Sequence, residues 1–137
     1  MENYMTQAKA ILKNYRQSPR KVRLVADAVR GKSVANALDV LSFIPKRAAL
    51  PLEKLLASAA ANAKNLDLAV ETLVVKELTV DGGATLYRRR PRSKGMANPI
   101  RKRTSHITVT LTNDLRSTTN DKKKGKKVVG SKSSVVS

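Results

Sequence analysis

The sequence predicts an α+β fold in which helices come first, antiparallel strands follow, and a long hairpin joins the last two strands. Between residues 18 and 65 apolar residues recur at helical spacing, whereas from residue 71 they alternate at the period of a strand. A second alternating segment lies at residues 107–111. If the two alternating segments pair antiparallel, the strongly basic stretch between them forms the far end of the hairpin.

The first two helices are delimited by cap and stop residues. Ser18 is a favourable N-cap, and Pro19 fits the first helical position. Gly31 supplies the C-terminal stop, and Ser33 is expected to cap the second helix, which ends at or before Pro45. One face of the first helix carries an apolar stripe and the other face carries basic residues, so one side can pack while the other meets phosphate.

The third helix is predicted to run to about Asn65, with an apolar stripe formed by Leu52, Leu55, Leu56, Ala59 and Ala63. Pro51 cannot donate an interior helix hydrogen bond. The regular helix is therefore expected to begin at Pro51 or to kink there.

Three strands are predicted: a weakly marked one at residues 7–13, then residues 71–80 and residues 107–111. In the strand at residues 71–80, one face is expected to hold Val74, Leu78 and Val80, and the other Leu73 and Val75.

The hairpin between the last two strands is expected to be long. Pairing Lys76 with His106, for example, puts the hairpin midpoint at Pro91. About 15 residues per strand at ~3.3 Å each would reach roughly 50 Å. Such a ribbon, isolated and self-repelling, is expected to be ordered only when bound.

Charge points to a polyanionic partner. The chain of 137 residues has a net charge of +18. Residues 1–81 carry a net +5, residues 82–113 carry eight basic residues and no acidic one, and residues 114–137 carry a net +5. Cations packed this closely repel one another unless a dense polyanion neutralises them, which favours nucleic acid over acidic substrates or anionic membranes.

Other function classes have little support. There is no cysteine, no apolar run of membrane-spanning length and no signal-peptide pattern, so a soluble intracellular protein is expected. The four aromatic residues are too few for a base-stacking platform.

Gly31-Lys32-Ser33 resembles the end of a P-loop, but position 26 is Ala26, and a helix stop followed by an N-cap explains it better. The single histidine, His106, has no orienting acid nearby. No catalytic residue, metal site or cofactor is predicted.

Three segments together resemble one known family. They are Ser18-Pro19-Arg20-Lys21-Val22-Arg23-Leu24-Val25 with Arg30-Gly31-Lys32, Ser58-Ala59 with Ala61-Asn62-Ala63, and Arg90-Pro91-Arg92 through Lys102-Arg103-Thr104-Ser105-His106-Ile107. In order and spacing they are similar to the universal large-subunit ribosomal protein number twenty-two, in its bacterial form, over about residues 6–112. The motifs are individually short, and their order and spacing carry the resemblance.

The resemblance implies three helices packed on a small three-stranded antiparallel sheet, with one long extended hairpin. It also implies a structural role in the large ribosomal subunit, where the protein would bind ribosomal RNA, assist assembly and line the nascent-polypeptide exit tunnel with its hairpin. The implied partners are large-subunit rRNA, neighbouring ribosomal proteins and the passing nascent polypeptide, with the protein monomeric within the ribosome. The implied location is the cytoplasm, with an organellar ribosome left open.

By the same resemblance, the residues expected to contact rRNA lie on the first helix and its flanks and along the hairpin. They are Arg16, Ser18, Arg20, Lys21, Arg23, Arg30, Lys32, Tyr87, Arg88, Arg89, Arg90, Arg92, Lys94, Arg101, Lys102, Arg103, Thr104 and His106. Tyr87 stands where the family commonly has a basic residue, so its contact is expected to be stacking. The tunnel-lining tip is expected to comprise Arg88, Arg89, Arg90, Pro91, Arg92, Ser93, Lys94, Gly95 and Met96.

The expected organisation is a single RNA-binding domain, residues 1–113, with its body at residues 1–83 and 104–113 and its arm at about 84–103. Residues 114–137 are expected to form a disordered, flexible basic C-terminal tail, since they show no periodic apolar face. The lysine-rich run 122–127 within it fits a phosphate-binding tail better than a nuclear localisation signal. The main rival is an architectural DNA-binding protein with a proline-tipped β-arm, although such proteins usually present two arms as a dimer.

Overall fold

The computed structural model describes residues 7–113, so the predicted C-terminal tail lies outside the described residues. The elements, in chain order, are β1 (Ala8–Tyr15), α1 (Pro19–Val29), α2 (Val34–Phe43), α3 (Ala49–Asn65), a 3-10 turn at Val70–Thr72, β2 (Val74–Gly82), β3 (Leu86–Pro91), a 3-10 turn at Ser93–Gly95, β4 (Ala97–Lys102) and β5 (Ser105–Thr112). This arrangement confirms the predicted α+β class.

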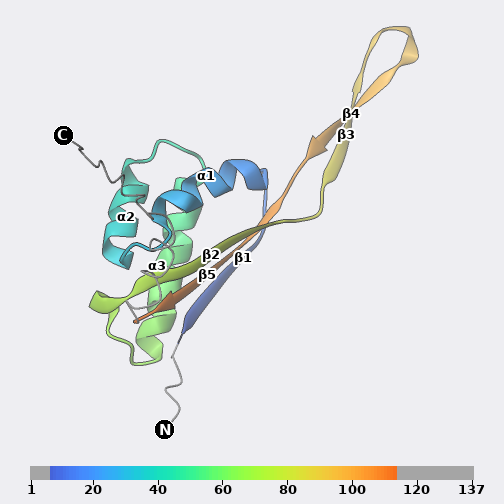
Figure 1. The fold of residues 1–137 in the computed structure, drawn as a ribbon. Coiled ribbons are helices and arrows are strands. Elements are labelled where there is room, and N and C mark those ends of the chain that lie inside the picture. The colour runs from blue at the N-terminus through green and yellow to red at the C-terminus, as the bar shows by residue number, and fades with distance from the viewer. Residues whose placement is uncertain (1–6, 114–137) are drawn as a thin grey trace, which may run out of the picture.

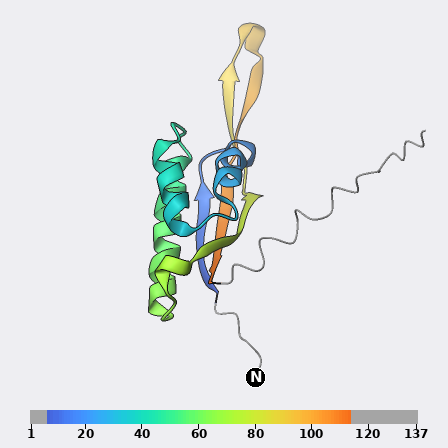
Figure 2. The same cartoon turned by 60° about the vertical axis from the view of Figure 1, so that its left-hand side comes forward.

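The body consists of a layer of helices on a three-stranded antiparallel sheet (Figures 1 and 2). The strand order is β1-β5-β2, so β5 is central and β1 and β2 form the two edges. Strands β3 and β4 pair only with each other, and this ribbon, called the arm below, projects away from the body (Figure 1).

One hydrophobic core joins the helices to one face of the sheet. The predicted stripes of α1 and α3 are buried, and so are the alternating apolar residues of β5, namely Ile107, Val109 and Leu111. On the opposite face of β5, Thr108 and Thr110 are half-buried. Alternation therefore predicted correctly which side of β5 packs.

The helix boundaries follow most of the predicted signals. Pro19 is the first residue of α1, and Gly31, with φ of +71°, follows its end. The backbone N–H of Asn36 donates to Ser33 Oγ at 3.4 Å, which confirms the second cap. Ser18 is the N-cap residue of α1, as predicted, and its carbonyl oxygen accepts from the N–H groups of Lys21 and Val22, but its hydroxyl accepts no hydrogen bond from the helix. The Ser18 hydroxyl is therefore free for another partner.

Pro51 neither starts nor kinks α3, contrary to the expectation from its chemistry. The helix begins two residues earlier, at Ala49, and Pro51 lies within its first turn. The N–H groups of the first turn have no partner inside a helix, so a proline there removes no hydrogen bond.

The predicted faces of β2 were wrong, because a bulge at Lys76 shifts the alternation. Val75 pairs with Leu111 but Glu77 pairs with Thr110, which leaves Lys76 as the extra residue. Residues paired across antiparallel strands share a face. Val75 thus joins Leu78 and Val80 on the core side, and Val74 lies on the other face.

The register of the hairpin also differs from the example predicted. His106 pairs with Asp81, five residues beyond Lys76, so the reversal is centred near Lys94 and Pro91 lies within β3. Lys94 and Gly95 adopt φ of 57° and 70°, which glycine tolerates and the fixed φ of proline does not allow. The projecting ribbon has six residues per strand, about 20 Å at ~3.3 Å per residue, because much of the predicted 50 Å belongs to the body sheet.

Candidate nucleic-acid interface

The arm is exposed along its whole length. Every residue of β3 and β4, and of the tip between them, is solvent-accessible. An isolated two-stranded ribbon contributes no hydrophobic core of its own. Its side chains are therefore available to a partner rather than to the fold.

Basic side chains lie on both faces of the arm. Because side chains alternate along a strand and paired residues share a face, Arg88, Arg90 and Lys102 lie on one side of the ribbon. Arg89 and Arg101 lie on the opposite side, together with Tyr87. A surface meant for one flat partner would need cations on one face only. Cations on both faces suit a partner that surrounds the arm.

The register of the arm keeps like charges from facing one another. The cross-strand pairs are Leu86 with Lys102, Tyr87 with Arg101, Arg88 with Ile100, Arg89 with Pro99, Arg90 with Asn98, and Pro91 with Ala97. Each cation in these pairs is opposite a neutral residue, and like charges directly opposite would destabilise the ribbon. This pairing lowers the repulsion that the composition alone suggested.

The tip is closed by backbone hydrogen bonds between Arg92 and Met96. The Arg92 N–H donates to the Met96 carbonyl at 2.7 Å, and the Met96 N–H donates to Ser93 at 3.3 Å. The Met96 side chain remains 66% exposed. Of the predicted tip residues, Arg92 to Met96 therefore form a short loop with Lys94 at its end, whereas Arg88 to Pro91 belong to strand β3.

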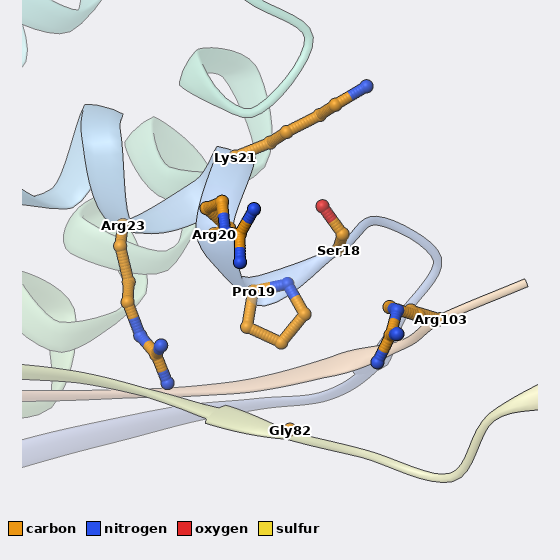
Figure 3. A pocket seen from close by; sticks show the side chains of 7 residues that line it. All are labelled: Ser18, Pro19, Arg20, Lys21, Arg23, Gly82 and Arg103. Carbon is orange, nitrogen blue, oxygen red and sulfur yellow. The ribbon is translucent and has the colours of Figure 1, made fainter.

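A basic hollow lies where the arm meets the N-terminus of α1 (Figure 3). It has a volume of about 450 Å³ and is lined by Ser18, Pro19, Arg20, Lys21, Arg23, Gly82 and Arg103. A second hollow of about 340 Å³ shares three of these residues and is lined by Arg16, Gln17, Ser18, Lys21, Arg47, Arg101, Lys102 and Arg103. Together, the two hollows at the arm base contain eight basic residues and no acidic one.

The start of α1 adds to the positive potential of these hollows. Helix N-termini carry a partial positive charge, which favours anions beside them. The first turn of α1 contains no acidic residue to offset that charge. Within residues 7–113 the one ion pair joins Arg30 to Asp27, so the cations of the hollows have no acidic partner there. The geometry suits phosphate oxygens.

Two arginines among the predicted contact residues bond to backbone carbonyls of β2. Arg23 donates to the carbonyl oxygen of Val80, and Arg30 donates to that of Leu78 at 2.9 Å. In Figure 3 the Arg23 side chain extends toward β2, whereas Lys21 extends away from the strands. Arg20 and Lys21 are exposed, and neither side chain forms a hydrogen bond within the described part of the chain.

Thr104 and His106 lie at the base of the arm and bond to the backbone. The Thr104 hydroxyl donates to the Ala84 carbonyl at 2.7 Å, and the Asn14 N–H donates to His106 Nδ1 at 3.1 Å. A Cβ added at Gly83 would clash with Thr104 Oγ1 and come within 3.0 Å of His106 Nε2. Glycine is therefore required at position 83, just after β2, where these two side chains approach the backbone.

Lys32 is separate from the cationic surface at the arm base. It lies in the turn after α1, at the opposite end from Ser18 of an 11-residue helix that is about 16 Å long at ~1.5 Å per residue. The hollow around it also contains Asp39, so its charge is mixed. Of the body residues predicted, the structure brings together Arg16, Ser18, Arg20, Lys21 and Arg23.

Sequence reasoning missed Gln17 and Arg47, which line the second hollow. Arg47 lies in the loop between α2 and α3, where its carbonyl oxygen accepts a hydrogen bond from the Tyr15 hydroxyl at 3.2 Å. The adjacent pair Lys46-Arg47 after a proline was the available signal. That pair looked like an ordinary solvated turn because nothing local places it beside the arm.

Metal and membrane chemistry find no support in the described residues. No group of three or more His, Cys, Asp or Glu side chains in residues 7–113 could hold a metal ion. No helix in that range is both long and apolar enough to cross a bilayer.

The fold and the exposed cations define a class of protein: a small α+β scaffold with a projecting basic arm. The family model described as ribosomal protein L22p/L17e matches residues 10–112. The chain is 56% identical over 108 residues to the large ribosomal subunit protein uL22 of Desulfitobacterium hafniense, covering 78% of this chain and 95% of that protein. It is 54% identical over 112 residues to the protein of the same name from Ligilactobacillus salivarius, covering 81% and 97%.

The chain therefore belongs to the ribosomal protein L22p/L17e family. As a member of this family it is a structural constituent of the large ribosomal subunit and not an enzyme. Both relatives come from bacteria, which confirms the bacterial type and, with it, the expected cytoplasmic location.

Proposed function

We propose that the chain binds large-subunit ribosomal RNA through two connected surfaces, the arm and the hollows at its base. One observation carries this proposal: cations occupy both faces of the arm, and no acidic residue occurs between residues 82 and 113. Neutralising phosphates releases counterions, so such a surface gains affinity mainly from RNA charge.

The two surfaces suit different RNA geometries. The arm is thin and basic on both sides, so it fits between RNA segments that approach it from opposite directions. The hollows at the arm base offer Ser18, Arg20 and Lys21 at a helix N-terminus, an arrangement suited to single phosphate groups. Holding several segments at once would assist assembly of the subunit.

The proposed site for the tip is the wall of the nascent-polypeptide tunnel. The loop from Arg92 to Met96 lies farthest from the body, and an arm embedded in RNA would present this loop beyond the phosphates it binds. The proposed partners are accordingly large-subunit rRNA, neighbouring ribosomal proteins and the passing nascent chain. Within the subunit the protein acts as a monomer.

Salt-dependent binding to RNA tests the proposal. The full chain is titrated with a large-subunit rRNA transcript and with duplex DNA of equal length at several salt concentrations. The double variant Arg88→Gln/Arg89→Gln removes one cation from each face. The negative slope of log affinity against log salt should therefore become shallower by about 1.4 to 1.8 units. Lys64→Gln, on α3, is the control and should leave the slope unchanged. An unchanged slope in the double variant would contradict the proposal, and tighter binding to DNA than to the rRNA transcript would favour the rival DNA-binding function.

A further inference from the structure

An apolar groove of about 370 Å³ lies between the edge strand β1 and the N-terminal half of α3. It is lined by Ile11, Leu12, Leu50, Pro51, Lys54, Leu55 and Ser58. Ile11 is 50% exposed and Leu50 is 59% exposed, so neither side chain is used by the core. Exposed apolar side chains gathered in one groove mark a surface suited to a partner.

The backbone beside this groove has unpaired hydrogen-bonding groups. β1 is an edge strand, and the Lys9 carbonyl points away from β5 because it accepts a hydrogen bond from Asn62 Nδ2 at 3.0 Å. Backbone groups two residues apart on a strand point to the same side, so the N–H and C=O of Ile11 also point outward. Because they point away from β5, these two groups take no part in the ladder between β1 and β5, and no loop or side-chain hydrogen bond within residues 7–113 reaches them. The edge of the sheet is therefore open where the groove begins.

We propose that this groove binds an extended segment of a partner protein, which adds to β1 as a fourth strand. Strand addition at an open edge takes its affinity from main-chain hydrogen bonds and its specificity from pockets for alternate side chains. Here the main-chain bonds are made to Ile11. Alternate apolar side chains of the segment pack against Leu50, Pro51 and Leu55.

The lysines around the groove indicate the composition of the partner segment. Lys54 lines the groove, Lys9 and Lys13 are exposed on either side of Ile11, and no acidic residue lines the groove. The segment therefore combines apolar residues with acidic ones. Residues 114–137 of this chain carry seven basic and two acidic residues, so the same lysines disfavour them as occupant. RNA is also disfavoured, because five of the seven residues that line the groove are apolar and offer phosphate oxygens no hydrogen-bond donor from their side chains.

The chain's own N-terminal residues are a poor alternative by sequence. To pair with β1 they would have to reverse direction at Thr6-Gln7, immediately before Ala8. Tight hairpin turns require Gly, Asn or Asp at their central positions, and this dipeptide has none. A segment from another protein of the subunit fits the open edge without such a turn.

Cross-linking in assembled large subunits tests the inference without reference to the RNA contacts. The full chain carries Leu50→benzoylphenylalanine, which is photoreactive, and the linked peptide is identified by mass spectrometry. The expected product is one segment of another ribosomal protein that contains both apolar and acidic residues. The same photoreactive residue at Leu24, 72% exposed on α1, is the control and should not link to that segment.

A second substitution shows whether the segment pairs with the strand edge. Ile11→Pro removes the outward N–H and no ladder bond to β5, so the yield of the link should fall roughly threefold to tenfold, the effect of one backbone hydrogen bond. Ile11→Thr retains the N–H and should keep most of the yield. If Ile11→Pro fails to fold, Lys54→Glu replaces it and should lower the yield at least threefold.

A link to rRNA, to a second copy, or to residues 1–6 or 114–137 would overturn the inference. Absence of a link, or a yield unchanged by these substitutions, would do the same.

Discussion

Arg23 donates two hydrogen bonds to the carbonyl oxygen of Val80, from Nε at 3.0 Å and from Nη2 at 2.7 Å. Two turns further on, at the C-cap of α1, Arg30 bonds to the carbonyl of Leu78 on the same edge strand. Residues seven apart share a side of a helix, and alternate carbonyls of a strand point the same way. The two arginines thus cover the outer edge of β2, which protects it from pairing with another strand.

Replacing Arg23 should therefore destabilise the body. Arg23→Ala removes both bonds to Val80 and is expected to lower the free energy of unfolding by about 1 kcal/mol, since the site is only partly buried. Arg20→Ala is the matched control, because Arg20 lies on the same helix and is exposed. Urea denaturation of the full chain measures both variants. Equal midpoints for Arg23→Ala and Arg20→Ala would show that the bonds to Val80 contribute nothing.

The base of the arm should be sensitive to a single methyl group. Gly83→Ala would force its Cβ against Thr104 Oγ1, and overpacking of this kind costs about 1–3 kcal/mol. Gly82→Ala is the neighbouring control, because its nearest contact would be Pro19 Cγ at an ordinary 4.0 Å. Thermal unfolding should show a clear loss of stability for Gly83→Ala alone. Similar melting temperatures for the two variants would contradict this account of the arm base.

In the absence of RNA the arm should exchange its amide hydrogens quickly. Residues 84–103 lie outside the hydrophobic core, whereas residues 52–65 belong to α3, whose apolar stripe is buried. Local stability follows buried apolar contact, so α3 should be protected and the arm should not be. Hydrogen exchange followed by mass spectrometry makes the comparison. Uniform protection of the free protein would show that the arm needs no partner to become ordered.

Shortening the arm should separate binding of the body from the role of the tip. Deleting residues 88–96 removes the tip and most of β3, while the hollows at the arm base keep Arg20, Lys21 and Arg103. The shortened protein should still enter large subunits and leave a wider channel. Sucrose-gradient sedimentation of cell lysates measures incorporation. Complete absence of the shortened protein from large subunits would show that the arm carries the affinity.

The elements with a strong local signal were predicted well. Helix stripes, the Gly31 stop, the Ser33 cap and the alternation of β5 depend on residues close in sequence, and the structure confirms each of them. The faces of β2 and the register of the arm depend on where a bulge falls. Lys76 becomes the extra residue only through pairing with β5, so counting along β2 could not locate it.

The sequence indicated which basic residues are candidates for the site, but not how each is used inside the fold. It pointed to the arm cations and to those at the start of α1, and the structure brings Arg101, Lys102 and Arg103 together with the latter at the arm base. The sequence did not indicate that Arg23 and Thr104 bond to backbone carbonyls, because those acceptors lie 57 and 20 residues away. Every residue has a backbone carbonyl, so the sequence does not show which one a distant side chain bonds to. Only the fold could assign these partners.

In the proposed function RNA surrounds the arm, with phosphates on both of its faces. The most direct test of this arrangement places a photoreactive residue at position 88 in one variant and at position 89 in another, since Arg88 and Arg89 lie on opposite faces. Large subunits containing each variant are irradiated, and the links are mapped on the rRNA. The account predicts links to rRNA from both positions, at different nucleotides. Links from one position only, or from neither, would contradict it.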